Sequence, residues 1–162
     1  MCANKTGGLA RMSAKMSAII SGATEEQVEA IGKFAESIGI AFQIQDDILN
    51  IQDATALSQN KGGVGEDIHE GKRTIMVIHS FNNGAESDVK RLKEILAMKT
   101  NDAELIHEAI SILKRNKSIE FAQKKMRGLI TEAWTELVNV LPPSAAVAKL
   151  KALVDYLIER EL

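Results

Sequence analysis

Proline is almost absent from this chain of 162 residues, and its two prolines stand side by side at Pro142 and Pro143. Because proline breaks helices and the chain is rich in alanine, leucine, isoleucine, glutamate and lysine, we expect long helices on both sides of the pair. Apolar residues recur at intervals of three and four, and no stretch alternates as a strand does. The sequence therefore predicts an all-α fold without internal repeats.

The expected helices are separated by short polar or glycine-containing segments. Thr24 and Ser144 are typical N-cap residues, because their hydroxyl oxygens can accept hydrogen bonds from the first turn. We expect helices over 5–21, 24–52, 73–81, 85–98, 102–115 and 118–141, and a last one from 144. Residues 53–72 hold four glycines and no apolar period, so we predict a mobile loop over the end of the long helix.

Three of these helices carry apolar residues spaced as on one helix face. The face holds Leu9, Met12, Met16 and Ile19 over 5–21, Val28, Ile31, Ala35, Ile38, Phe42 and Leu49 over 24–52, and Phe121, Met126, Ile130, Trp134 and Leu137 over 118–141.

Composition narrows the class of protein. Apolar residues make up 45% of the chain, charged residues 26%, and the formal net charge is −2, so we expect a folded domain without nucleic acid partners. The single cysteine, Cys2, suits a reducing compartment. We see neither an apolar run of the ~20 residues that span a membrane nor a signal peptide, and so expect a cytoplasmic protein.

One helix face is polar where the rest of the helix is apolar. Gln43, Asp46, Asp47 and Asn50 follow at steps of three and four and share this face. No basic residue occurs between Lys33 and Lys61, although that segment holds four acidic residues, so a cation should offset their repulsion. Carboxylate and amide oxygens suit Mg²⁺, which bridges protein carboxylates to substrate phosphates.

The glycine-rich segment offers basic partners for such a phosphate. Lys72 and Arg73 follow Gly71, and Lys61 precedes another glycine pair, so a diphosphate could lie between a metal ion and these lysines. The alternative for the acidic pair alone is a solvated turn at the end of a helix.

These segments resemble the polyprenyl synthase family, the trans-isoprenyl diphosphate synthases. FQIQDDILN (42–50) resembles the family's second aspartate-rich motif, DDxxD, with Asn50 in its last position. KTGG (5–8) resembles the KTG segment, and KG (61–62) followed by EDIHEGKRT (66–74) resembles the segment after the second motif. The resemblance covers essentially the whole chain and implies the isoprenoid synthase helical bundle.

The resemblance also implies a reaction, a cofactor and site residues. A trans-prenyltransferase condenses isopentenyl diphosphate with an allylic prenyl diphosphate, and Mg²⁺ assists the ionisation. By position, Asp46 would bind Mg²⁺ with support from Asp47 and Asn50, and Asp67 would fix a metal-bound water. The residues that would contact diphosphate are Lys5, Lys61 and Lys72. Thr6 and Gln43 would face the reacting carbons, and Phe42 would line the isopentenyl site.

The chain departs from the family pattern in one major respect. The family's first aspartate-rich motif lies upstream of the KTG segment, and no second DDxxD occurs here. We therefore expect residues 1–162 to be the C-terminal portion of one isoprenoid synthase domain, with the N-terminal half missing. The fragment should then expose apolar faces and form a homodimer or associate with the missing half.

Three alternatives remain open from the sequence. The chain could be a non-catalytic or truncated subunit that completes the bundle of a prenyl synthase partner. A terpene cyclase shares the fold, but the KTG and EGK segments favour the condensing enzymes. An unrelated helical scaffold with an acidic turn is the last.

Overall fold

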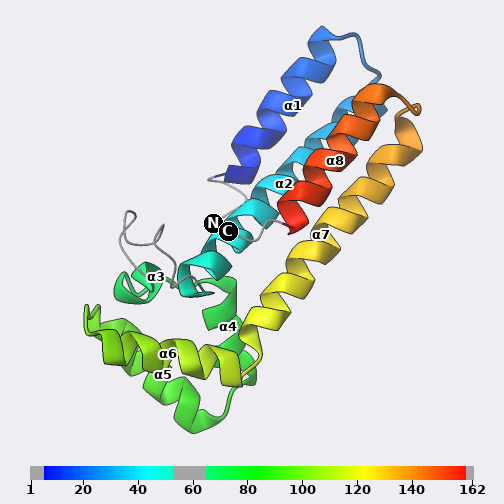
Figure 1. The fold of residues 1–162 in the computed structure, drawn as a ribbon. Helices are drawn as coiled ribbons and strands as arrows, with labels where there is room; N and C mark the ends of the chain where they lie inside the picture. Colours follow the sequence, from blue (N-terminus) through cyan, green and yellow to red (C-terminus); the bar gives the residue numbers. More distant parts are fainter. Residues whose placement is uncertain (1–5, 53–64, 160–162) are drawn as a thin grey trace. The chain divides into compact units, whose positions relative to one another are not determined.

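The structure is a computed structural model that describes residues 6–52 and 65–159. These residues form helices and turns and contain no strand, which confirms the predicted all-α fold (Figure 1). The helices are α1 (Gly8–Ile20), α2 (Glu25–Gln52), α3 (Glu66–His69), α4 (Ile75–Asn83), α5 (Glu86–Met98), α6 (Ala103–Arg115), α7 (Ser118–Val140) and α8 (Ala145–Glu159). Among these described helices, none has the length and hydropathy needed to span a bilayer.

The observed helix ends lie within a few residues of the predicted ones, and side-chain caps explain several of them. Thr24 Oγ1 accepts from the Gln27 N–H at 3.3 Å, and Gln27 Oε1 accepts from the Thr24 N–H at 3.1 Å. This reciprocal pair is a capping box at the start of α2. Ser144 Oγ accepts from the Val147 N–H at 3.2 Å and confirms the predicted cap of α8.

The chain divides into two compact units, the first running to Gln43 and again from Lys125, the second over Ile44–Lys124. In the first unit, the polar side of α1 faces α2. Arg11 lies 2.9 Å from Glu36, and Lys15 pairs with Glu29. The contact also includes close packing at Gly32 of α2, where an added Cβ would lie 2.6 Å from Cγ of Lys15.

The other helices of the first unit pack through aromatic rings. Phe34 of α2 meets Trp134 of α7 edge to face, with ring centroids 5.8 Å apart. The Lys151 ammonium of α8 lies 5.8 Å from the centre of the Trp134 ring, in a cation–π arrangement. Lys33 of α2 also donates to Glu136 of α7 at 2.7 Å.

The predicted apolar face of α2 is only partly correct. Val28 is buried, but Phe42 remains 38% exposed, and the buried positions instead include Phe34, Ala41 and Ile48. These three follow a second stripe with a spacing of seven. Both stripes have helical spacing, so periodicity alone does not decide which one faces the core.

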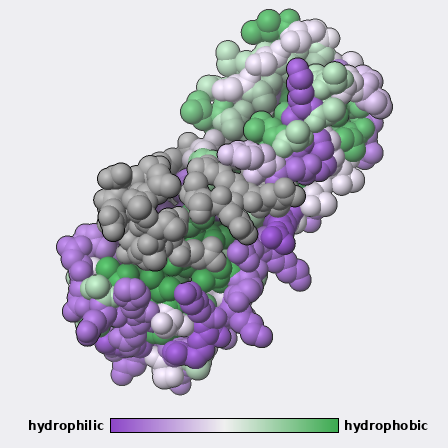
Figure 2. Space-filling model, viewed as in Figure 1, coloured by the Kyte–Doolittle hydropathy of each residue, from purple (hydrophilic) through white to green (hydrophobic). Residues whose placement is uncertain are grey.

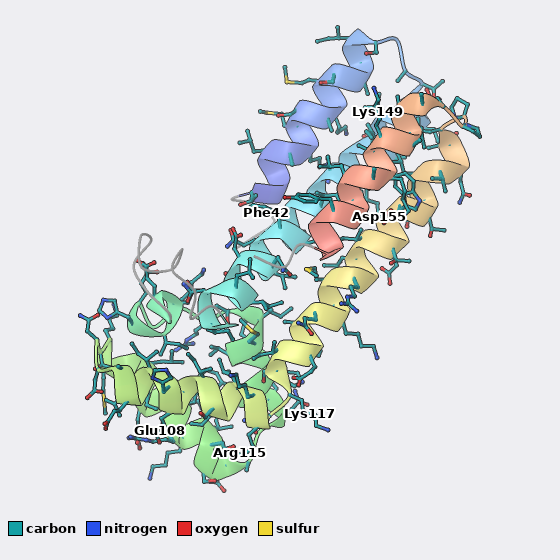
Figure 3. The ribbon with its side chains drawn as sticks, in the orientation of Figure 1. Phe42, Glu108, Arg115, Lys117, Lys149 and Asp155 are labelled. Carbon is teal, nitrogen blue, oxygen red and sulfur yellow. The ribbon has the colours of Figure 1, made fainter. Side chains whose placement is uncertain are left out.

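The second unit has its own core, formed by the end of α2, by α3–α6 and by the start of α7. Its most buried side chains are Ile48, Ile68, Met76, Val77, Leu92, Ile95 and Leu113. Ion pairs join α5 to α6, where Arg91 binds Glu108 at 2.7 Å and Arg115 binds Asp88 at 2.6 Å (Glu108 and Arg115 in Figure 3).

The prediction of a loop over 53–72 is wrong for part of its length. Residues 66–69 form α3, which contacts α5 and α6 and buries Ile68 almost completely. Four residues carry too little helical periodicity to be recognised, and these tertiary contacts supply the stability that such a short helix lacks by itself. Residues 53–64 lie outside the described part of the chain.

Candidate functional site

The two neighbouring aspartates of α2 have opposite environments. Asp47 is buried, with 4% of its surface exposed, whereas Asp46 is exposed. Successive residues of a helix point about 100° apart, so one carboxylate faces the interior of the second unit and the next faces outward. The pair therefore offers one fixed and one accessible carboxylate.

Lys72 provides the cation that the charge balance of α2 requires. Its Nζ donates to Asp47 Oδ1 at 2.8 Å and to Asp67 Oδ1 at 3.0 Å. One ammonium group thus joins the end of α2 to α3. Charge counting predicted an offsetting cation, but the sequence did not indicate that Lys72 would be that cation.

Partial burial and hydrogen bonds shift the pKa values of Asp67 and Lys72. Burial raises the pKa of Asp67, and the hydrogen bond from Lys72 offsets this only in part. Burial alone would lower the pKa of Lys72, but hydrogen bonds to Asp47 and Asp67 outweigh it and raise that pKa above its usual range. Lys72 is therefore fully charged at neutral pH. In the part of the chain that the structure describes, Asp67 Oδ2 is buried without a hydrogen-bond partner.

Asn50 ties the segment before Lys72 to α2. Its side-chain Oδ1 accepts from the Asp67 N–H at 3.1 Å, and its backbone oxygen accepts from the Gly65 N–H at 2.8 Å. The predicted site residues Asp47, Asn50, Asp67 and Lys72 therefore lie together within the second unit.

The donor set fits a magnesium ion that is held by few protein ligands. Among the described residues, no group of three or more histidine, cysteine or acidic side chains forms a closed metal site. Mg²⁺ does not require one, because it keeps several waters and commonly uses one or two carboxylates plus substrate phosphates. The exposed carboxylate of Asp46 suits that role.

Three predicted residues belong to the first unit. The Thr6 backbone lies against α2 at Gly39, where an added Cβ would be 3.3 Å from the Thr6 carbonyl carbon and 2.9 Å from Gly7 Cα. Gln43 follows Gly39 by one turn on the same face of α2. Phe42 lies on α2 and is partly exposed (Figure 3). Lys5 and Lys61 lie outside the described residues.

Comparison with known proteins agrees with this fold. The family model for polyprenyl synthetase matches residues 1–113. The short chain isoprenyl diphosphate synthase of Methanocaldococcus jannaschii is 45% identical over 124 residues, which make up 76% of this chain and 36% of that protein. Its counterpart in Methanothermobacter thermautotrophicus is 35% identical over 99% of this chain and 48% of its own length.

A solved structure agrees as well. Geranylgeranyl pyrophosphate synthetase from Pyrococcus horikoshii matches 99% of this chain and 48% of its own chain, with a TM-score of 0.86 and 36% identity. The fold is that of the all-α prenyl synthases, and the chain belongs to the polyprenyl synthetase family. The resemblance predicted from the motifs is confirmed, and an unrelated helical scaffold is excluded. The chain spans less than half the length of these relatives.

Proposed function

We propose that this chain carries the diphosphate-binding part of a short-chain trans-prenyltransferase, which condenses isopentenyl diphosphate with an allylic prenyl diphosphate. The names of its relatives support the reaction class, since they are short-chain isoprenyl and geranylgeranyl diphosphate synthases. The observation that carries the proposal is the placement of Lys72 between Asp47 and Asp67, because it joins a cation and two carboxylates at one point.

The roles proposed for the residues rest on the family resemblance and, for Asp46, Asp67 and Lys72, also on their environments. Bound Mg²⁺ would stabilise negative charge on the departing diphosphate. By resemblance, Asp46 would hold the ion with support from Asp47 and Asn50, and Asp67 would fix a metal-bound water. Lys72 would donate to the diphosphate oxygens, as Lys5 and Lys61 would by resemblance. Thr6 and Gln43 would present oxygen dipoles to the allylic carbons as positive charge develops, and Phe42 would line the isopentenyl site.

We further propose that the apolar stripe of α1 packs against further helices of the same fold. Leu9, Met12, Met16 and Ile19 are between 53% and 62% exposed, and Figure 2 shows apolar side chains over α1. Their steps of three and four are those of a helix–helix seam. The relatives, at more than twice the length, contain additional chain that could supply such helices; a second copy of this chain is the alternative occupant.

Calorimetry with inorganic diphosphate tests the proposed site directly. We expect binding that requires Mg²⁺ and weakens by about tenfold or more in Asp46→Asn, because the variant loses the accessible carboxylate. Asp155→Asn on α8 is a matched control, since Asp155 pairs with neighbouring Lys151 and its side chain is 45% exposed (Figure 3). Equal affinity with and without Mg²⁺, or an Asp46→Asn variant that binds like the control, would contradict the proposal.

A further inference from the structure

We propose that Asn50 is a positioning residue, whose side chain caps α3 from outside and so holds Asp67 and Lys72 beside Asp47. The resemblance places Asn50 among the residues that support a metal ion. The structure assigns its side-chain oxygen to another partner, the Asp67 N–H at 3.1 Å.

The need for this contact follows from the sequence of α3. The first N–H groups of a helix have no partner within the helix, and an N-cap side chain normally accepts from one of them. The N-cap of α3 is Gly65, which has no side chain to do this. Asp67 is the second residue of α3, so Asn50 of α2 supplies the acceptor that Gly65 lacks.

A second hydrogen bond fixes the same junction. The Asn50 backbone oxygen accepts from the Gly65 N–H at 2.8 Å, so one residue of α2 holds α3 at two successive points. Ile68, between Asp67 and the following turn, packs almost fully buried against the core. Loss of the side-chain contact should therefore loosen the start of α3 without unfolding the second unit.

Asp67 in turn positions Lys72. The Lys72 N–H donates to the Asp67 backbone oxygen at 2.8 Å, and Lys72 Nζ donates to the Asp67 carboxylate at 3.0 Å. The direction of the Lys72 side chain thus depends on where Asp67 lies. Under the proposed function, on which this step rests, Asn50 sets the geometry of diphosphate binding without touching the ligand.

Amide hydrogen exchange by NMR tests the anchor independently of any ligand. In Asn50→Ala we expect the Asp67 amide to exchange about fivefold faster or more, because the hydrogen bond from the Asp67 N–H to the Asn50 side chain, which slows exchange, is lost. Asn50→Asp keeps the acceptor and should exchange like wild type. Asn83→Ala is the matched control, since Asn83 makes its side-chain hydrogen bond to His79 at the surface of α4. The amide of buried Leu92 reports any loss of global stability.

Diphosphate affinity then tests the consequence. We expect Asn50→Ala to weaken Mg²⁺-dependent diphosphate binding severalfold, whereas the control Asn83→Ala should bind like wild type. An Asp67 amide that exchanges at the wild-type rate in Asn50→Ala would overturn the proposal, as would an Asp67 amide that exchanges as fast in Asn50→Asp as in Asn50→Ala. If wild type binds no diphosphate, the proposed function fails, while the exchange rates still decide whether Asn50 is the anchor.

Discussion

Lys72 has two roles at the scale of single residues, and they can be separated. It neutralises two buried carboxylates in the protein alone, and under the proposed function it also donates to the diphosphate. Two acids at 4% and 13% exposed side-chain surface repel each other strongly without a cation, because little water screens them. The first role should therefore be visible in stability, without any ligand.

We predict that Lys72→Met lowers the free energy of unfolding by roughly 2 kcal/mol. Breaking a buried ion pair costs more than this, but Lys72 is a third exposed, which reduces the loss. Urea unfolding followed by circular dichroism measures the change. Adding Asp47→Asn to Lys72→Met should restore part of the stability, since one of the two uncompensated charges is then removed.

A surface pair provides the control for this experiment. Lys33 and Glu136 are both more than half exposed, so Lys33→Met should change stability by only about 0.5 kcal/mol. If Lys72→Met costs no more than Lys33→Met, the cluster of Asp47, Asp67 and Lys72 does not exist in solution as the structure has it.

The structure brings together four residues that the sequence singled out, Asp47, Asn50, Asp67 and Lys72, but the sequence did not predict how they are arranged. The motifs pointed to Asp67 and Lys72, but the prediction that Asp46 and Asp47 share one polar face is wrong, because Asp47 is buried and Asp46 is exposed. Whether Asp47 or Asp46 turns toward the interior depends on how α2 packs, which its periodicity leaves open. The partners of Lys72 are 5 and 25 positions away, so pairing at that range depends on the tertiary fold.

At the scale of elements, helices with local signals were predicted well and those without them were not. Thr24 and Ser144 start their helices through hydrogen bonds to residues three positions later, which is information within one turn. By contrast, α3 depends on Asn50 of another helix and on packing of Ile68, and neither is visible within its own four residues.

The turn that follows α3 provides a test of how this element directs Lys72. Gly71 has a φ of +68°, and a Cβ there would lie 2.7 Å from the Leu96 backbone oxygen. We predict that Gly71→Ala lowers the free energy of unfolding by about 2 kcal/mol or more, since conformational strain adds to a clash with backbone. Denaturant unfolding measures the loss, and diphosphate affinity should fall with it because Lys72 is displaced.

Two other glycines separate the contributions. Gly22 has a φ of +75° but open space around its Cβ position, so Gly22→Ala should show only the strain, about 1 kcal/mol. Gly128 lies within α7 with nothing within 4 Å, and Gly128→Ala should stabilise by about 0.5–1 kcal/mol. A Gly71→Ala variant no less stable than Gly22→Ala would show that α5 does not approach this turn so closely.

At the scale of the whole molecule, α1 has an unusual polarity. Arg11 and Lys15 face α2 and pair with its acids, while the apolar stripe of α1 is exposed, and no residue of α1 is buried. Exposed ion pairs contribute little to stability, so these pairs alone hold α1 weakly. An apolar stripe of this kind is typical of a surface that another helix covers.

We therefore predict that the chain of residues 1–162 self-associates in solution through α1 when no other helices cover the stripe. Light scattering coupled to gel filtration should show a mass that rises with concentration, because burial of apolar side chains drives the contact. Met12→Gln with Met16→Gln should shift the protein toward the monomer while leaving the ion pairs of Arg11 and Lys15 intact. Ile78→Gln is the matched control, since Ile78 is 48% exposed on α4 and lies outside the stripe. A monomer at every concentration, or equal effects of the α1 and α4 variants, would remove α1 as the contact surface.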